Sequence, residues 1–300
     1  MSTTPVTQRD LSVPALLVTV VAWASAFVGI RAASDTFSPG ALTLGRLLVG
    51  AVALGLIARP RLRGLDLRGR QLALVLTYGV AWFGVYNVAL NAAERDLDAG
   101  TTALIVNIGP ILIALLAGVL LKEGFPRPLM IGMAVAFVGV VLIALSTRHD
   151  DTAVATASTA GVVLAVVAAV CYAVGVLAQK PTLVSLTSGQ SVWLGCVIGA
   201  VVCLPFGPQL VREVGDAPLG DIGWVVFLGV VPTAIGFSTW SYALKRLSAG
   251  QVASTTYLVP AVTTLMSWVV LDEVPAALAF VGGALCLVGV AVTRYRRRPA

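Results

Sequence analysis

Ten runs of mostly apolar residues, each near the length of a membrane-crossing helix, make up most of this chain of 300 residues. A helix crosses the roughly 30 Å hydrocarbon layer of a bilayer with about 20 residues. Because backbone groups in lipid find no water to bond, such runs have to be helical. The charged fraction is 11% and the mean hydropathy is +0.95, whereas soluble domains carry about 25% charged residues. The sequence therefore predicts an all-α polytopic membrane protein with ten transmembrane helices.

The predicted helices are separated by short polar or charged segments. They cover residues 13–33, 39–58, 71–93, 98–121, 128–146, 159–180, 188–207, 221–243, 250–270 and 275–293. The first run lacks the short apolar core and the small-residue cleavage site of a signal peptide, so we expect it to be retained as a helix.

Lysines and arginines fall unevenly between the loops. If the N-terminus lies in the cytoplasm, 15 of the 20 basic residues lie on the cytoplasmic side, including the run from Arg59 to Arg70. The positive-inside rule therefore predicts that the N- and C-termini are both cytoplasmic. The net charge of +6 is therefore explained by basic residues that lie at the surface of the lipid bilayer, where anionic headgroups attract them. No nucleic-acid-binding motif accompanies it, so nucleic acid is not an expected partner.

The second half of the chain repeats the first. A shift of 150 positions places residues 97–100 on residues 247–250 and Pro110 on Pro260, and the register continues through the following apolar run. Each repeat holds five predicted helices, an odd number, so the second repeat enters the membrane from the opposite side. Inverted repeats of this kind are typical of membrane transporters.

The repeats define the expected domain organisation. We expect a first five-helix repeat at residues 13–148 and a second, inverted one at residues 159–293. A linker of small and polar residues at 149–158 joins them.

Several segments resemble a known family of transporters. Residues 23–31 (Trp-Ala-Ser-Ala-Phe-Val-Gly-Ile-Arg) resemble the opening helix of the EamA family in the drug/metabolite transporter superfamily, apart from Ala24, where glycine is common. Residues 44–48 are similar to that family's second helix, which typically carries an arginine, here Arg46. The proline-containing fourth and ninth helices, the glutamates that follow them and the Gly-rich fifth and tenth helices are similar too.

This resemblance implies both a fold and a function. The fold is a bundle of ten helices around a central cavity, lined mainly by the first to fourth and sixth to ninth helices, with the fifth and tenth at the periphery. The function is export of small metabolites, often amino acids or similar solutes, usually without ATP.

Arg46 is the one charged side chain well inside a predicted span. An arginine at the centre of a membrane helix costs about 2.5–3.5 kcal/mol on insertion scales. The predicted spans offer no carboxylate to pair with it. Two hypotheses remain open: Arg46 locks helices together, or it holds a solute carboxylate through two parallel hydrogen bonds.

Other polar and aromatic residues are candidates for the solute path. Proline breaks a helix and frees a carbonyl group, and broken helices at repeat interfaces often form transporter sites. Pro110 and Pro260 are such helix-breaking residues, preceded at matching positions by Asn107 and Tyr257, although ordinary polar packing is an alternative. Further candidates for substrate binding, or for plain packing, are Trp23, Tyr86, Asn87, Tyr172 and Trp240.

Charged residues at equivalent ends of the repeats are candidate gates. Glu123 and Glu273 end the fourth and ninth helices, and Arg31 and Lys180 end the first and sixth. These residues are either gates that pair alternately across the two faces or ordinary charges at helix ends.

The motifs that the chain lacks limit its chemistry. It has no GxxxxGK[ST] loop for ATP, and its predicted spans hold no set of catalytic residues, so we expect no enzyme. Its four cysteines lie inside predicted spans without metal-ligand spacing, so no metal or cofactor is expected.

The sequence favours a secondary transporter that exports amino acids or related small-molecule solutes by alternating access. Two alternatives stay open: a passive channel, or an intramembrane enzyme acting on lipids. Seventeen arginines against three lysines are typical of a GC-rich bacterium, and we expect its cytoplasmic (inner) membrane to hold the protein as a monomer or homodimer.

Overall fold

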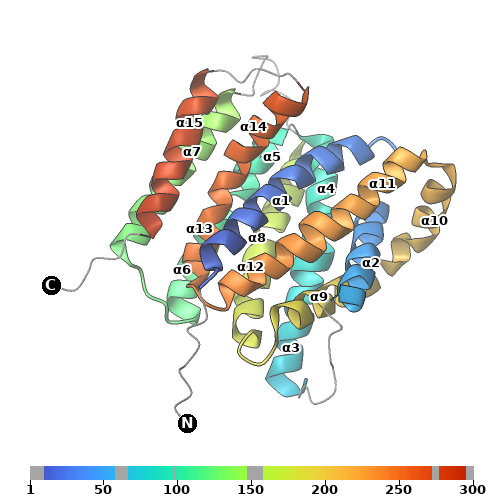
Figure 1. The fold of residues 1–300 in the computed structure, drawn as a ribbon, viewed down its shortest axis with the longest axis horizontal. Helices are drawn as coiled ribbons and strands as arrows, with labels where there is room; N and C mark the ends of the chain where they lie inside the picture. Colours follow the sequence, from blue (N-terminus) through green and yellow to red (C-terminus); the bar gives the residue numbers. More distant parts are fainter. Residues whose placement is uncertain (1–9, 58–66, 98, 147–157, 272–276, 295–300) are drawn as a thin grey trace, which may run out of the picture.

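The ten predicted membrane-crossing segments are helical in the computed structural model of the chain (Figure 1). The structure describes residues 10–57, 67–97, 99–146, 158–271 and 277–294. Within them, seven helices have 18 or more residues and enough hydrophobicity to cross a membrane. These are Ser12–Ala33 (α1), Pro39–Ile57 (α2), Gly69–Asp96 (α3 to α4), Arg127–Ser146 (α7), Thr159–Thr182 (α8), Ser188–Asp216 (α9 to α10) and Leu219–Leu244 (α11 to α12). The prediction of a polytopic all-helical membrane protein is confirmed.

The other three segments are shorter or interrupted. The fourth consists of Ala99–Val106 (α5) and Gly109–Leu120 (α6), the ninth of Ala249–Ser254 (α13), Thr255–Tyr257 (η5, a 3₁₀ turn) and Leu258–Leu271 (α14), and the tenth of Ala277–Thr293 (α15). Both interruptions come just before a proline: residues 107–108 lie two or three residues before Pro110, and the 3₁₀ turn lies three to five residues before Pro260. Proline has no N–H to donate to the carbonyl four residues earlier, so the helix changes its hydrogen bonding there.

The third and eighth segments share a feature that the sequence analysis missed. In the middle of each, a π-helical turn replaces regular α-helix, at Gly79–Val85 (η1) and Gly229–Gly236 (η4). The flanking helices are Gly69–Tyr78 (α3), Tyr86–Asp96 (α4), Leu219–Leu228 (α11) and Phe237–Leu244 (α12). The 150-residue shift places one turn on the other, so the irregularity belongs to the repeat. π-Turns inside helices are frequent at functional sites.

Two predicted helix ends are wrong. The third segment extends to Asp96 instead of stopping at residue 93. The seventh runs from Ser188–Cys203 (α9) through Leu204–Phe206 (η3) into Gly207–Asp216 (α10), where we expected a loop. α10 is amphipathic, with Leu210 packed on the core and Glu213 accepting a hydrogen bond from the Ser38 N–H at 2.9 Å.

α7 and α15, the fifth and tenth helices, pack on each other at one side of the bundle (Figure 1). Their glycines meet in antiparallel pairs: a Cβ added at Gly132 would lie 2.5 Å from the Gly289 carbonyl oxygen, and one at Gly139 would lie 2.5 Å from that of Gly282. The four glycines are equivalent under the 150-residue shift. Each helix therefore presents the same pair of glycines to the other. Without side chains at these positions, the backbones of α7 and α15 can approach each other closely.

The opposite faces of the helices carry large apolar side chains. Val21, Leu120 and Leu287 are more than half exposed. An exposed apolar surface of this extent is expected for a protein whose surroundings are lipid rather than water.

We predict that Gly139→Ala destabilises the protein, because its methyl group would push against the backbone of α15, and overpacking costs about 1–3 kcal/mol. Gly223→Ala in α11 is the matched control, since a Cβ there meets nothing within 4 Å. The measurement is the thermal denaturation midpoint in detergent, followed by size-exclusion chromatography. Equal midpoints for the two variants would contradict the close packing of α7 and α15.

Candidate functional site

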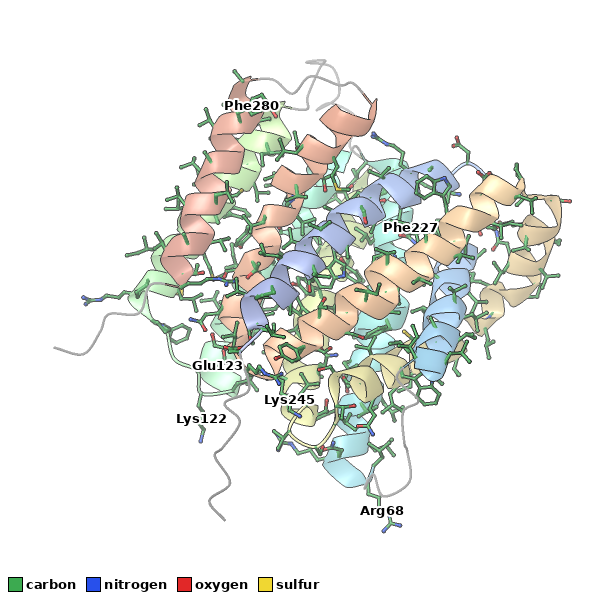
Figure 2. All side chains as sticks on the ribbon, in the orientation of Figure 1. Arg68, Lys122, Glu123, Phe227, Lys245 and Phe280 are labelled. Carbon is green, nitrogen blue, oxygen red and sulfur yellow. The ribbon has the colours of Figure 1, made fainter. Side chains whose placement is uncertain are left out.

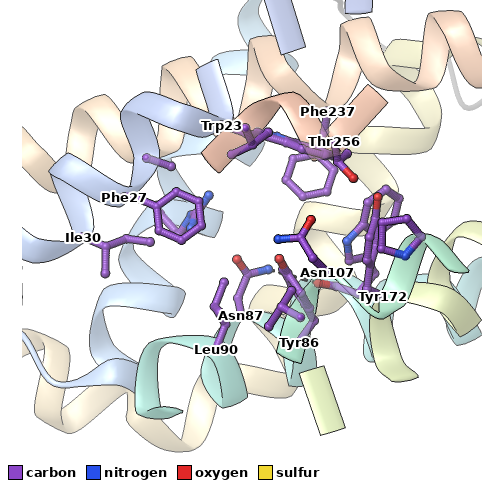
Figure 3. Close-up of a pocket in the computed structure, with 16 residues that line it drawn as sticks. Trp23, Phe27, Ile30, Tyr86, Asn87, Leu90, Asn107, Tyr172, Phe237 and Thr256 are labelled. Atoms are coloured by element: carbon purple, nitrogen blue, oxygen red, sulfur yellow. Dashed lines mark hydrogen bonds between the residues drawn. The ribbon is translucent and has the colours of Figure 1, made fainter. Parts of the chain in front are cut away.

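A pocket lies in the centre of the bundle, where helices from both halves of the chain meet (Figure 3). Its wall is built by α1, α2, η1 and α4, by the break between α5 and α6, and by α8, α12, η5 and α14. About 700 Å³ of space lies between its side chains, counting the open mouth.

Six of the eight residues that we singled out for substrate binding line this pocket: Trp23, Arg46, Tyr86, Asn87, Asn107 and Tyr172. Figure 3 shows Trp23 and Phe27 on the α1 side, and Asn87 and Leu90 facing them from α4. The sequence positions of these residues span both repeats, so the fold brings distant segments to one site.

Tyr257 and Trp240 do not line the pocket. Tyr257 is fully buried and its ring packs beside Phe137, with 6.3 Å between the centroids. Its neighbour Thr256 takes the place at the pocket wall. Successive residues of a helix point about 100° apart, and the 3₁₀ turn at this point shifts that phase, which the alignment of the repeats did not reveal.

A cluster of aromatic rings forms one wall of the pocket. Trp82 lies 5.5 Å from Tyr172 and 4.9 Å from Phe237 between ring centroids, while Trp23 lies 5.2 Å from Phe237. Trp240 supports this wall from behind, 5.0 Å from Trp23. Tilted and edge-to-face contacts of this kind fix the rings in place, so the pocket presents a rigid apolar wall.

Arg46 supplies the positive charge of the pocket. Its side chain is 4% exposed, and its Nε donates a hydrogen bond to the Thr233 hydroxyl at 3.1 Å. Thr233 in turn donates to the Leu228 carbonyl at 2.7 Å. Among the described residues, the guanidinium makes no further hydrogen bond. Arg46 thus links α2 to η4 through one nitrogen and keeps its terminal nitrogens for another acceptor.

Polar side chains bond the carbonyl groups that the π-turns release. The Asn87 side-chain amide donates to the carbonyls of Trp82 and Phe83 at 3.0 and 2.9 Å. In the second repeat, the Trp23 ring nitrogen donates to the Pro232 carbonyl at 3.2 Å. Buried carbonyls need such partners, and these two bonds orient residues that line the pocket.

Two oppositely charged residues, Glu123 and Lys180, pair at one face of the molecule, where Figure 2 labels Glu123. Lys180 Nζ lies 3.6 Å from Glu123 Oε1. Both Glu123 oxygens accept the Ala249 N–H, at 2.9 and 2.8 Å, so Glu123 sits at the N-terminus of α13. Lys180 also donates to the carbonyl groups of Leu244, at 2.9 Å, and Leu247.

Of the four predicted gate residues, the structure brings Glu123 and Lys180 together. Arg31, the equivalent of Lys180, is exposed at the end of α1. Glu273 lies outside the described residues.

Two features of the site escaped sequence reasoning. Thr256 lines the pocket but was not among the predicted binding residues. Glu94 is a carboxylate inside the long third helix, because that helix continues past the predicted end. The signal for Glu94 was available: Asn87, Leu90 or Asn91 and Glu94 follow at three- and four-residue spacing, which is one helix face.

The described part of the chain holds no group of three or more side chains suited to a metal ion. The chemistry available in the pocket is therefore hydrogen bonding, charge pairing with Arg46 and apolar contact. A solute-sized pocket within a membrane-spanning bundle is the arrangement of a membrane transporter.

Comparison with known proteins agrees. The chain belongs to the EamA-like transporter family, whose model matches residues 11–145 and 159–295. It is 39% identical over 290 residues to a "Probable terminal-alkyne amino-acid exporter" of Streptantibioticus cattleyicolor, covering 95% of each chain. It is 26% identical to a "Probable amino-acid metabolite efflux pump" of Escherichia coli, covering 97% of this chain and 96% of the relative. A solved crystal structure shares the fold with a TM-score of 0.75 and 20% identity, covering 95% of this chain and 97% of that one.

We predict that Thr233→Val lowers the stability of the protein. Valine keeps the shape of threonine but leaves the buried Arg46 Nε without its acceptor, which costs about 1–3 kcal/mol. Thr77→Val is the control, because the Thr77 hydroxyl bonds only the Ala73 carbonyl of its own helix, at 2.8 Å. Thermal denaturation midpoints should fall for Thr233→Val alone, and an unchanged midpoint would mean that the Arg46–Thr233 bond is unimportant.

Proposed function

We propose that this protein is a secondary transporter that exports small carboxylate-bearing metabolites, amino acids or related solutes, by alternating access around the central pocket. The observation that carries this proposal is the buried Arg46 at the pocket wall. One nitrogen of its guanidinium is held by Thr233, and its terminal nitrogens have no acceptor among the described residues.

A guanidinium held in this way is ready for a carboxylate. Arg binds carboxylates through two parallel N–H···O bonds, and such charge-assisted bonds are about twice as strong as neutral ones. The bond from Nε to Thr233 fixes the plane of the group before the solute arrives, so little ordering remains to be done on binding. Asn107 and Thr256 add further polar side chains to the pocket wall.

The aromatic wall supports a solute with an apolar part. Trp23, Trp82 and Phe237 suit a hydrocarbon side chain, and their faces attract an ammonium group through cation–π interaction. The relative from Streptantibioticus cattleyicolor is named for an amino acid with a terminal alkyne, and the one from Escherichia coli for amino-acid metabolites. An amino acid with an apolar side chain fits these names and this pocket.

The charge distribution and the packing of α7 on α15 support inverted repeats. We place both termini in the cytoplasm and the chain in the cytoplasmic membrane of a bacterium. The repeats at residues 13–148 and 159–293 then enter the membrane from opposite sides, which accounts for the antiparallel, self-complementary contact between their last helices. The pocket is lined within one chain, so either a monomer or a homodimer can carry out transport.

In this orientation, the Glu123–Lys180 cluster closes the cytoplasmic face. Rocking of the repeats would separate α6 from α8 and α13, break the ion pair and the bonds from the Ala249 N–H to Glu123, and open the pocket to the cytoplasm. Exposed ion pairs are worth about 0–1 kcal/mol, and this partly buried one is a modest barrier. Such a barrier keeps the face closed without preventing its opening.

We expect Arg46→Lys to reduce solute exchange about tenfold or more, because lysine keeps the charge but lacks the planar fork. The measurement is counterflow of radiolabelled amino acids in proteoliposomes, with Arg95→Lys as control. Arg95 donates to the Ser34 and Phe37 carbonyls through a single nitrogen, a contact that lysine can also make. Flux that does not saturate and shows no counterflow in the wild type would favour a passive channel.

If the Glu123–Lys180 ion pair holds the cytoplasmic face closed, its loss is expected to make buried residues of α13 accessible to water. Ala253 lies one turn before Thr256 and is fully buried, so a cysteine introduced there reports on access to this helix. With Ala253→Cys in both proteins, this cysteine should react with maleimide faster when Lys180→Met is also present than when Lys180 is retained. Lys245→Met is the matched control on the same face, since Lys245 bonds only the Leu186 carbonyl, at 3.2 Å. Equal labelling rates in all three backgrounds would remove the gate role of Lys180.

A further inference from the structure

Glu94 is a carboxylic acid in the membrane-spanning part of the protein, next to the pocket but not on its wall. It lies on α4 one turn beyond Leu90, and Leu90 and Asn87 line the pocket from the same helix. Residues at this spacing share one helix face, so Glu94 lies on the same face of α4 as Asn87 and Leu90, one turn beyond the pocket wall.

The hydrogen bonding of Glu94 differs from that of Glu123. Glu94 Oε1 is buried and has no hydrogen-bond partner among the described residues, whereas both oxygens of Glu123 accept a backbone N–H. An ionised Glu94 thus has one oxygen buried without a donor, which is costly, and a proton removes most of that cost by removing the charge.

Two arginines and a tyrosine surround Glu94. It interacts electrostatically with Arg46 of α2 and Arg31 of α1, and Tyr86 of its own helix interacts with both Glu94 and Arg46. Among the described residues, none of these groups approaches within ion-pair distance of Glu94. The other elements packed against α4 are α8, η1 and α5. Of these, α8 packs Ala165 and Ala168 against this part of α4, and its Tyr172 lies further along, 6.0 Å from Tyr86 between ring centroids. η1 and α5 carry no charged residue.

Charge balance links Glu94 to the solute. When Glu94 is ionised, its charge balances that of the buried Arg46, whereas Arg31 is exposed at the end of α1, where water screens its charge. A carboxylate bound to Arg46 would add a second negative charge within the low-dielectric interior, where like charges repel strongly. Protonation of Glu94 restores neutrality. By linkage, a proton on Glu94 then strengthens binding of the carboxylate by the same factor as the carboxylate strengthens binding of the proton.

We propose that Glu94 is a proton-binding site that takes up a proton when a solute carboxylate binds Arg46, so that a proton and the carboxylate cross the membrane together. This inference rests on the proposed function, in which Arg46 receives the carboxylate. It assigns the proton as the coupling ion and Glu94 as a second charged residue, beside Arg46, that takes part in transport.

The direct test is the infrared band of a protonated carboxylic acid, followed as a function of pH in purified protein. In the wild type, sodium propionate is expected to raise the pH at which the band disappears, compared with sodium chloride at the same ionic strength. The assigned band should be absent from Glu94→Gln and unchanged in Asp96→Asn, an exposed carboxylate at the end of the same helix. Arg46→Gln should raise the midpoint on its own and abolish the effect of propionate.

The possible outcomes separate the two proposals. A midpoint that neither propionate nor Arg46→Gln moves would overturn the role of Glu94, and counterflow that still depends on Arg46 would leave the proposed function intact. A midpoint that Arg46→Gln moves but propionate does not would overturn the linkage, and would count against carboxylate binding at Arg46 as well.

Transport gives a second readout. With one linked proton, apparent solute affinity in the wild type should fall by up to about tenfold per pH unit on the alkaline side. In Glu94→Gln this pH dependence should disappear, while Asp96→Asn should keep it. Persistence of the wild-type pH dependence in Glu94→Gln would refute the assignment.

Discussion

The cost of burying the Arg46 charge explains much of the arrangement around the pocket. A cation in the middle of a bilayer is tolerated only where protein, water or a ligand replaces its hydration. Here Thr233 satisfies one nitrogen, the pocket lies against the rest of the group, and Glu94 provides a negative charge nearby. A hydrophobic residue at this position would be far easier to insert, so the arginine is most simply explained by a solute that needs it.

The helices that surround this charge deviate from regular geometry in matching places. The π-turns at η1 and η4 and the breaks before Pro110 and Pro260 occur in both repeats. η1 and the two breaks line the pocket, and η4 bonds Arg46 and Trp23 of its wall. The π-turns release backbone carbonyls, which Asn87 and Trp23 bond. Irregular backbone at membrane depth is tolerated where it lines a cavity. The same segments are the natural hinges for motion of the bundle, because their hydrogen bonds can be rearranged at lower cost than those of a straight helix.

Sequence reasoning predicted the features that depend on local composition and failed where packing decides. Apolar length fixed the number of helices, and proline marked the breaks in the fourth and ninth segments. The π-turns were not foreseen, because glycine at positions 79 and 229 permits them without requiring them. Glu94 was missed because three polar or charged residues, Glu94 to Asp96, resemble a helix end, although the helix continues through them. Thr256 and Tyr257 were exchanged because a 3₁₀ turn rotates side chains in a way that no spacing rule captures.

The repeats are symmetric in their backbone but not in their binding residues, and both properties serve transport. Equivalent elements, such as α7 and α15 or η1 and η4, allow two arrangements of the bundle with similar free energies, as alternating access requires. A symmetric pocket, however, would hold two guanidinium groups in one low-dielectric space. In the first two helices of each repeat the register is 149 residues, so the repeat position of Arg46 is Gly195, which packs against Phe83. The repeat position of Asn107, at a shift of 150, is Tyr257, which is buried outside the pocket. Under the proposed function, a single arginine on one side of the pocket would give the solute one orientation, while the equivalent elements of the two repeats would allow both faces to open in turn.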